Sequence, residues 1–370
     1  MIIKNATVYG PDFEPIKTDI TIDGEIISDL GACDADGENF SGCNVLPGFI
    51  DIHIHGCNMA DATDGNPDSA AKMSRWLATK GVTSFCPTTM TLPEDFLEKC
   101  FSYVAETMGN EEGAYIHGIN MEGPFISHAK KGAQAGEHIV APNFEMLRNL
   151  NDICPVSLVD IAPEADGADE FIEKAKEICT VSLAHTAADY ATGKAAIEKG
   201  AKHATHLYNA MTCLTSREAG MVGAVLDSEN VMAEIICDGI HICPATLRIT
   251  FKALGEDRSV VISDSLMAAG MPDGEYMLGG QKVYKRSDAR LADGTLAGSV
   301  TNLFEEFHNL LGFGIPLRQA LKSVTINPAK AIGADKITGS IEVGKNADLL
   351  ITSGDFKEIK AVFIKGKRVV

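Results

Sequence analysis

Short apolar runs alternate with amphipathic segments through the middle of the chain. Runs rich in β-branched residues predict strands, whereas apolar positions at helical spacing predict helices. Phe171, Ile172, Ala175 and Ile178, for example, would share one face of a helix. Helices are expected at 67–80, 93–108, 169–179 and 189–199. Strands are expected at 45–54, 82–88, 115–121, 156–162, 180–185, 203–208, 233–238 and 260–264.

This alternation predicts an α/β protein whose central unit is a (β/α)8, TIM-like barrel over 47–337. Nearly every expected strand is followed by an expected helix, which favours a closed barrel. An open doubly wound sheet is the alternative. The two ends instead contain short β-type runs broken by proline and glycine, and neither has enough apolar surface for its own core. We therefore expect 1–46 and 338–370 to form one small β-sandwich domain.

Composition narrows the class of partner. The chain has 370 residues and a net charge of −19, from 51 acidic and 32 basic side chains. Nucleic acids and anionic membranes attract clustered Lys and Arg, so neither is an expected partner.

The ten cysteines form no CxxC pair and are expected to be reduced, buried thiols. No apolar run approaches the roughly 20 residues of a membrane span, and residues 1–10 lack a signal-peptide pattern, so we expect a cytoplasmic protein.

Polar side chains recur where the expected strands end, and His53 and His55 end the first strand. Side chains at i and i+2 of a strand share a face, so both imidazoles would point into the barrel mouth. Paired imidazoles suit a divalent metal. Taken alone, such a pair is equally well explained as two histidines packing at a strand end.

The remaining candidates are Glu122, His185, His206 and Asp264, at the ends of the third, fifth, sixth and eighth strands. Each alone has an ordinary structural explanation, as a helix cap or a packed histidine. Together with His53 and His55 they would line one rim, the face of a barrel where active sites are built. The set therefore predicts a metal site.

Metal chemistry suggests a reaction. A divalent ion lowers the pKa of bound water toward about 7 and can polarise a carbonyl group. Asp264 could take the water proton and deliver it to a leaving amine, as a general base and then a general acid. This combination predicts hydrolysis of an amide or a similar C–N bond.

The motifs resemble those of the amidohydrolase superfamily, and more closely those of the N-acetylglucosamine-6-phosphate deacetylases. The run ATHLYNAM with a downstream arginine and DGIH is the most specific part of the resemblance. The segments are PGFID at 47–51, MEGPF at 121–125, KKG at 130–132, AHT at 184–186, ATHLYNAM at 204–211, DGIH at 238–241, LAGS at 296–299 and NPA at 327–329.

The resemblance implies a division of the metal ligands. Glu122, His185 and His206 would hold one ion, while His53 and His55 would hold a second that Asp264 also contacts. One or two divalent ions per subunit are therefore expected. Zn²⁺ and Fe²⁺ both suit such ligands.

The resemblance also implies a phosphorylated amino-sugar substrate and a homodimer in which Arg217 reaches the neighbouring subunit's site. A guanidinium can bind phosphate oxygens in two places, which would meet the substrate's charge locally on an acidic protein. A surface arginine paired with Glu218 is the alternative. The implied substrate-binding residues are Ala133, Gln134, Asn209, Ala210, Arg217, Asp238, Gly239, Ile240, His241, Leu296, Ala297 and Gly298.

One position departs from the family pattern, since many members have histidine where this chain has Gln134. An amide can donate a hydrogen bond but cannot carry a positive charge.

Four other interpretations of the function compete with this one. N-acetylgalactosamine 6-phosphate fits equally well. An N-acyl amino acid would not use Asn209, Arg217 and His241, and a non-catalytic scaffold would not need the complete ligand set. Cyclic amidases commonly carry a lysine that 159–164 lacks.

Overall fold

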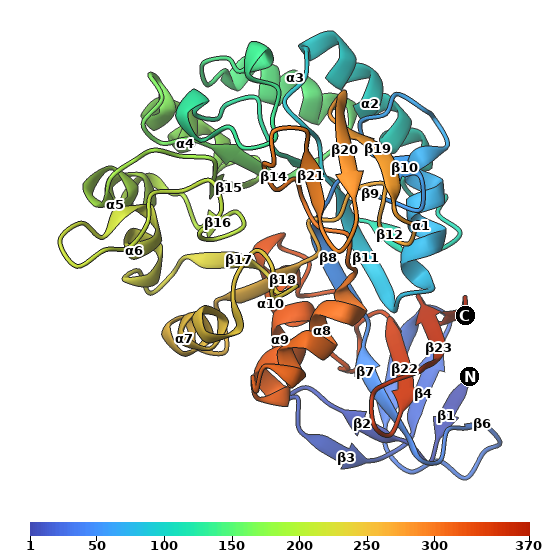
Figure 1. The fold of residues 1–370 in the computed structure, drawn as a ribbon. Coiled ribbons are helices and arrows are strands. Elements are labelled where there is room, and N and C mark those ends of the chain that lie inside the picture. Colours follow the sequence, from blue (N-terminus) through green and yellow to red (C-terminus); the bar gives the residue numbers. More distant parts are fainter.

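The computed structural model describes all 370 residues and contains the predicted alternation of parallel strands and helices. Figure 1 shows the helices outside the parallel strands, with both termini at one side of the molecule. The first sheet has the order β12-β11-β8 and the second runs in chain order from β13 to β18. These strands are β8 (Phe49–Ile54), β11 (Val82–Pro87), β12 (Tyr115–Ile116), β13 (Ile119–Met121), β14 (Val156–Ile161), β15 (Thr180–Leu183), β16 (His203–Ala204), β17 (Met232–Ile236) and β18 (Ser259–Ile262).

Helices follow the strands and bury their apolar faces against them. In α4, Phe171, Ile172 and Ala175 are buried as predicted, whereas Ile178 lies beyond the helix end. Asn143 caps α3 by accepting the Met146 N–H, which satisfies one of the free donors of the first turn. The helices are α1 (Ser69–Ala78), α2 (Glu94–Thr107), α3 (Phe144–Ile153), α4 (Ala168–Ala175), α5 (Tyr190–Lys199), α6 (Gly220–Leu226), α7 (Pro244–Leu254), α8 (Leu303–Gly312), α9 (Leu317–Val324) and α10 (Ile326–Ala331), with 3-10 turns at His128–Lys130 and Gly136–His138.

The first and last barrel strands, β8 and β18, meet without forming a hydrogen-bonded ladder. Asp51 joins them instead: its carboxylate accepts the Ser263 hydroxyl at 2.6 Å and the Ser263 N–H at 3.3 Å. Two residues after β18, the Asp264 N–H donates to the carbonyl of His53 in β8 at 2.9 Å. The seam therefore fixes the relative position of two predicted site segments.

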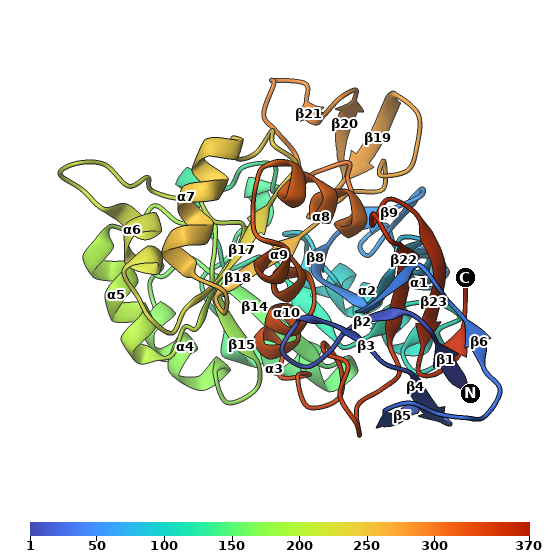
Figure 2. The ribbon, with the colours of Figure 1, turned by 90° about the horizontal axis from the view of Figure 1, so that it is seen from below.

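The chain ends contribute to two further sheets, with orders β5-β4-β1-β6 and β24-β23-β22-β7-β2-β3. Side chains from both sheets share one apolar cluster that includes Ile3, Ile20, Leu349 and Phe363. Figure 2 shows the two termini close together beside these strands. The strands are β1 (Ile2–Lys4), β2 (Thr7–Tyr9), β3 (Pro15–Lys17), β4 (Ile20–Asp23), β5 (Ile26–Leu30), β6 (Glu38–Asn39), β7 (Cys43–Pro47), β22 (Leu349–Ser353), β23 (Ile359–Ile364) and β24 (Lys367–Arg368).

The strand predicted over 45–54 is wrong as a single element. It comprises β7, which pairs with β2 and β22 in the terminal sheet, and β8, which belongs to the barrel. Gly48 separates them, and a Cβ on Gly48 would lie 2.1 Å from the Thr83 side chain. The continuous apolar run hides this change of sheet because both strands are buried.

The sequence interpretation missed an antiparallel sheet inside the barrel segment, formed by β19 (Gly274–Leu278), β20 (Gln281–Lys285) and β21 (Ala289–Leu291). The β19–β20 hairpin turns at Gly279 and Gly280, both with positive φ. A Gly-Gly pair between alternating segments is a recognised hairpin signal. Two short strands, β9 (Gly56–Cys57) and β10 (Ala60–Asp61), form another hairpin near the seam.

All ten cysteines are free thiols, as expected. Only five of them are buried, however, and Cys213 and Cys243 are exposed, so the expectation of buried thiols was wrong for part of the set. None of the helices is both long and apolar enough to cross a bilayer.

Candidate active site

The structure brings the six predicted metal-site residues together at the carboxyl ends of the barrel strands. His53 lies in β8, and the others lie within two residues after a strand. None of the six is more than 6% exposed. Burial of so many polar side chains requires that they satisfy one another or bind a ligand. The residues are His53, His55, Glu122, His185, His206 and Asp264.

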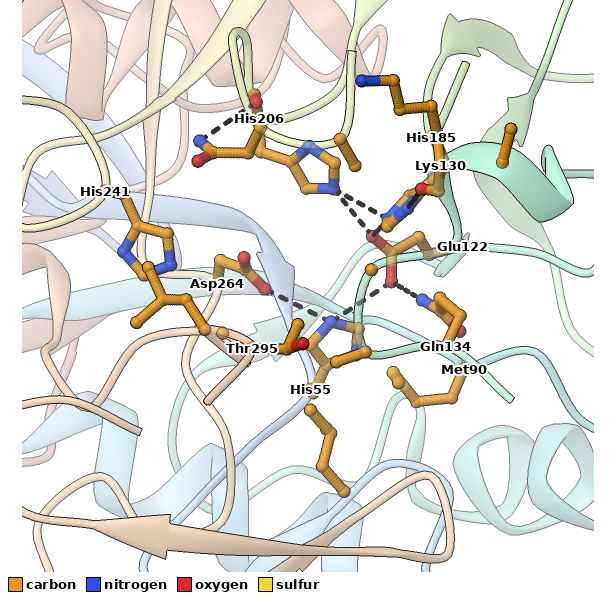
Figure 3. Close-up of a pocket in the computed structure, with 18 residues that line it drawn as sticks. His55, Met90, Glu122, Lys130, Gln134, His185, His206, His241, Asp264 and Thr295 are labelled. Atoms are coloured by element: carbon orange, nitrogen blue, oxygen red, sulfur yellow. Dashed lines mark hydrogen bonds and ion pairs between the residues drawn. The ribbon is translucent and has the colours of Figure 1, made fainter. Parts of the chain in front are cut away.

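The first group comprises Glu122, His185 and His206. The Nε2 atoms of both histidines lie 3.0 Å from Glu122 Oε1 and 3.1 Å from each other. Figure 3 shows these three side chains converging above His55 and Gln134. Two imidazole nitrogens and one carboxylate oxygen facing a common point are a ligand set suited to Zn²⁺ or Fe²⁺.

The second group comprises His53, His55 and Asp264. Asp264 Oδ1 lies 3.2 Å from His55 Nε2 and 3.6 Å from His53 Nε2. Glu122 adjoins this group as well, because its Oε2 lies 3.4 Å from His55 Nε2. The Glu122 carboxylate therefore faces both groups: its Oε2 approaches His55, while its Oε1 contacts His185 and also lies 3.7 Å from His53 Nε2.

The surroundings of the imidazoles fit metal ligation. The Nδ1 of His185 lies 2.8 Å from the Lys130 carbonyl and that of His55 lies 3.3 Å from the Thr88 carbonyl. A carbonyl can only accept, so each Nδ1 donates, and in the neutral ring Nε2 then carries the lone pair that a metal needs. His53 Nε2 is buried and has no hydrogen-bond partner, as expected of an atom reserved for an ion.

Electrostatics favour ionised carboxylates at the centre. Burial alone would raise the pKa of Glu122, but hydrogen bonds from His185 and His206 hold that pKa well below its usual range. Burial likewise opposes ionisation of Asp264, while the hydrogen bond from His55 and the nearby histidines lower its pKa. The corresponding interaction raises the pKa of His55 to about 9 against the effect of burial. Asp264 is thus a carboxylate able to accept a proton.

Three of the six residues have left-handed backbone conformations, with φ of 42° at His185, 31° at His206 and 46° at Asp264. Residues other than glycine adopt this region at an energetic cost, and such residues cluster at functional sites. Neighbouring segments hold the conformation at Asp264, whose carbonyl accepts the Ser299 N–H at 2.7 Å. A Cβ on Gly298 would lie 2.8 Å from the same carbonyl oxygen, so this approach requires glycine.

A cavity of about 360 Å³ opens above the two groups. It is lined by His55, Glu122, His185, His206 and Asp264, and by most of the predicted substrate-binding residues. The latter are Ala133, Gln134, Asn209, Ala210, His241, Leu296 and Gly298. Met90, Thr295 and Leu278 also line it, although the sequence interpretation did not select them. Leu278 comes from the unpredicted sheet at β19, which explains why it was missed.

The other predicted substrate-binding residues lie outside the cavity wall. Asp238 supports the wall from behind, with a carboxylate oxygen 2.7 Å from His241 Nδ1. That contact lowers the pKa of Asp238 even though burial opposes ionisation. Gly239 adjoins Phe313, Ala297 is fully buried and Ile240 is 44% exposed.

Arg217 is exposed in the segment between β16 and α6 and does not line the cavity. It forms no ion pair, so the alternative pairing with Glu218 is not what the structure contains. A free guanidinium on an exposed segment is available to an anion or to another molecule.

Gln134 is fixed at both ends of its amide. Its Oε1 accepts the Thr91 N–H at 2.7 Å, and its Nε2 donates to Glu122 Oε2. The side chain is 2% exposed and lies beside Glu122 in Figure 3. In this structure Gln134 therefore orients a predicted metal ligand, in addition to lining the cavity.

The sequence interpretation missed Glu234, which lies fully buried in β17 next to His53. Its Oε2 is 2.9 Å from His53 Nδ1. Burial raises the pKa of Glu234 well above its usual value. The available signal was a single charged residue within the apolar strand MAEII.

Comparisons with known proteins identify the family. The model of the amidohydrolase family matches residues 44–369. The N-acetylglucosamine-6-phosphate deacetylase of Bacillus subtilis (strain 168) is 38% identical over 86% of this chain and 83% of its own length. The N-acetylgalactosamine-6-phosphate deacetylase of Escherichia coli O157:H7 is 33% identical over 87% of each chain.

Solved structures give the same result. The N-acetyl-D-glucosamine-6-phosphate deacetylase of Mycobacterium smegmatis, solved in complex with N-acetyl-D-glucosamine-6-phosphate, superposes with a TM-score of 0.93. It is 29% identical and covers 100% of this chain and 99% of its own. Sequence and fold comparisons thus agree, and the chain belongs to the amidohydrolase family, where it groups with the N-acetylglucosamine-6-phosphate deacetylases.

Proposed function

We propose that the protein hydrolyses the acetamide bond of N-acetylglucosamine 6-phosphate, giving glucosamine 6-phosphate and acetate. The observation that carries this proposal is the position of Asp264, an ionised carboxylate within 3.2 Å of His55 at the base of the cavity. The relatives named N-acetylglucosamine-6-phosphate deacetylase support the choice of substrate.

The chain's residues divide the work in the proposed reaction. A bound divalent ion supplies Lewis acidity, lowering the pKa of water and polarising the acetyl carbonyl. Asp264 takes one proton from the attacking water as its oxygen adds to the carbonyl carbon. Asp264 then gives that proton to the amide nitrogen as the C–N bond breaks, so that the amine leaves neutral. His241, whose Nδ1 contacts Asp238, lines the cavity and would bind the sugar phosphate.

Two divalent ions, Zn²⁺ or Fe²⁺, would suit the two ligand groups. Glu122, His185 and His206 would hold one ion, and His53, His55 and Asp264 the other. Support comes from the Glu122 carboxylate, which faces both groups, and from the unpartnered Nε2 of His53. Metal analysis of protein purified without added metal would give the identity and number of the ions.

The test is acetate release from N-acetylglucosamine 6-phosphate by metal-loaded protein, with Asp264→Asn as the paired variant. We expect release by the wild type and a loss of several orders of magnitude in the variant, which should still bind metal through Glu122, His185 and His206. No release by metal-loaded wild type would overturn the proposed substrate. Equal release by the variant would overturn the role of Asp264.

N-acetylgalactosamine 6-phosphate is the second candidate substrate, and the 33% identical relative named for that activity favours it specifically. The two sugars differ at one hydroxyl group. The ratio of kcat/KM values for the two phosphates ranks them directly. The unphosphorylated sugar, measured alongside, shows how much binding depends on the phosphate.

A homodimer in which Arg217 completes the neighbouring site would explain why this arginine is exposed and unpaired in its own subunit. Mixing two inactive variants tests the idea. A heterodimer of Arg217→Ala with Asp264→Asn would contain one intact site only if Arg217 acts across the interface. Recovery of activity on mixing supports the arrangement, and no recovery from a demonstrated heterodimer would exclude it.

We also propose that 1–46 and 338–370 form a small β-sandwich domain beside the 47–337 barrel. The apolar cluster shared by Ile3, Ile20, Leu349 and Phe363 supports that division. The ten free thiols support a reducing compartment such as the cytoplasm. Subcellular fractionation of the native host and domain-resolved hydrogen exchange would test these two points.

A further inference from the structure

Glu234 is the one charged residue of β17, in the segment Met-Ala-Glu-Ile-Ile. It is 0% exposed and lies behind the ring of predicted metal ligands. A buried acidic side chain in an otherwise apolar strand costs stability unless it has partners. Its partners therefore indicate why the position is not apolar.

Both hydrogen-bond partners of the Glu234 carboxylate belong to predicted metal ligands, and His203 Nδ1 lies farther away, 3.9 Å from Oε1. Glu234 Oε2 lies 2.9 Å from His53 Nδ1 and 3.3 Å from the backbone nitrogen of His206. The backbone N–H can only donate, so Oε2 acts as an acceptor. When Glu234 is ionised, His53 Nδ1 donates to the same oxygen, which leaves the His53 Nε2 lone pair directed away from Glu234.

That lone pair is directed toward the proposed metal centre. His53 Nε2 lies 3.6 Å from Asp264 Oδ1 and 3.7 Å from Glu122 Oε1, and it has no hydrogen-bond partner. The Nδ1 atoms of His55 and His185 face backbone carbonyls, which a substitution cannot remove. His53 alone among these three depends on another side chain for its orientation.

We propose that Glu234 is a positioning residue that fixes the tautomer and ring orientation of His53, and so sets the affinity of the ion that His53 holds. The proposal rests on the proposed function in one respect, that His53 is a metal ligand. Because Glu234 also accepts the His206 N–H, it connects His53, in one ligand group, with His206, in the other. Acceptors of this kind behind ligating histidines contribute about 10- to 100-fold to metal affinity.

The test distinguishes the effect of the length of the Glu234 side chain on metal affinity from the effect of its charge. Metal-free full-length protein is titrated with Co²⁺, with the visible absorption spectrum reporting ligand geometry, and zinc content is measured after equilibration in zinc buffers. Glu234→Gln keeps an oxygen at the same reach and should stay within about threefold of wild type. Glu234→Asp keeps the charge but withdraws the acceptor, and Glu234→Leu removes it; both should lose about 10- to 100-fold in affinity.

Two further variants make the outcome decisive. His53→Ala gives the full deficit expected when this ligand is absent. Glu306→Leu removes another fully buried carboxylate, which bonds Thr301 and contacts none of the six ligands, and should leave metal affinity unchanged. Wild-type affinity and spectrum in folded Glu234→Asp, alongside a deficit in His53→Ala, would overturn the role of Glu234. No deficit in His53→Ala would instead show that His53 is not a ligand, and the metal assignment would fail.

Discussion

His185 Nε2 and His206 Nε2 lie 3.1 Å apart, and both face the same oxygen of Glu122. Two imidazole lone pairs cannot point at one another stably without a cation or a proton between them. The arrangement therefore gains free energy when an ion binds, and the unfolded chain has no equivalent site.

Metal removal should lower the free energy of unfolding. Return of the ion at a hundred times its Kd should restore about 2.7 kcal/mol, since binding only the native state stabilises it by mass action. Urea unfolding with chelator and with buffered Zn²⁺ measures the difference. An unchanged midpoint, with zinc shown to bind, would contradict a preformed site.

Glu122→Gln should impair both ligand groups together, because the Glu122 carboxylate lies 3.0 Å from His185 in one group and 3.4 Å from His55 in the other. We expect metal affinity at both positions to fall by at least about 100-fold. Loss of a residue that only hydrogen-bonds a ligand costs about 10- to 100-fold, and loss of a ligand should cost more. Metal content after dialysis reports the change. Glu98→Gln, on the exposed side of α2, serves as the matched control. Loss of only one ion would show that Glu122 serves one group alone.

Gln134→Leu should destabilise the protein by about 1–3 kcal/mol, because the buried Thr91 N–H and one Glu122 oxygen lose their partner. Gln134→Glu has nearly the same shape but places a second carboxylate against Glu122. It should be at least as unstable without metal, and metal should recover part of the loss. Denaturant unfolding of both variants checks this; a neutral Leu variant would contradict the assigned contacts.

His117, which is not one of the predicted metal ligands, should make the free energy of unfolding depend on pH. Burial lowers the pKa of His117 from 6.5 to about 4 in the folded protein. Between these values the unfolded chain binds more protons than the folded one, so stability rises with pH. Relative to His117→Gln, the wild type should lose about 2–3 kcal/mol as the pH falls from 7 to 4.5. Parallel stability curves for the two proteins over this range would refute the assignment.

Cys243 should be the first thiol to react with iodoacetamide. It is exposed, it precedes α7, and hydrogen bonds from Thr246 lower its pKa. A larger thiolate fraction and free access both increase the alkylation rate. Peptide mapping after brief labelling at pH 7 identifies the modified position, and Cys243→Ser should remove the fast phase. Faster labelling of Cys213, which is also exposed, would show that access alone decides the rate.

Most of the parallel strands and the positions of the six rim residues could be predicted because both depend on local signals. The strand expected over 115–121 is wrong as a single element, since it consists of β12 and β13 in different sheets. An apolar run ending in a histidine or a carboxylate can be recognised without knowing what lies across the barrel. His185 and His206 were placed in this way, each after its own strand.

Features that depend on distant segments were not predictable in this way. The division of 45–54 between two sheets depends on β22, about 300 residues away in the chain. Gln134 donates to the second carboxylate oxygen of Glu122 from a loop. No periodic pattern in the sequence predicts the conformation of that loop. Glu234 showed its charge in the sequence, but its partner on β8 is 181 residues away.

The contact between β8 and β18 also affects the order in which parts of the chain fold during synthesis. Asp51 and Ser263 are 212 positions apart, and their contact joins the first and last parallel strands. Contacts of such long sequence separation form late, because closing the intervening loop must precede any gain from them. During synthesis, His53 and His55 emerge from the ribosome long before Asp264, so two of the three residues of this ligand group are made well before the third. A nascent chain that stops short of Ser263 can form strands and helices but cannot close the barrel or complete that group.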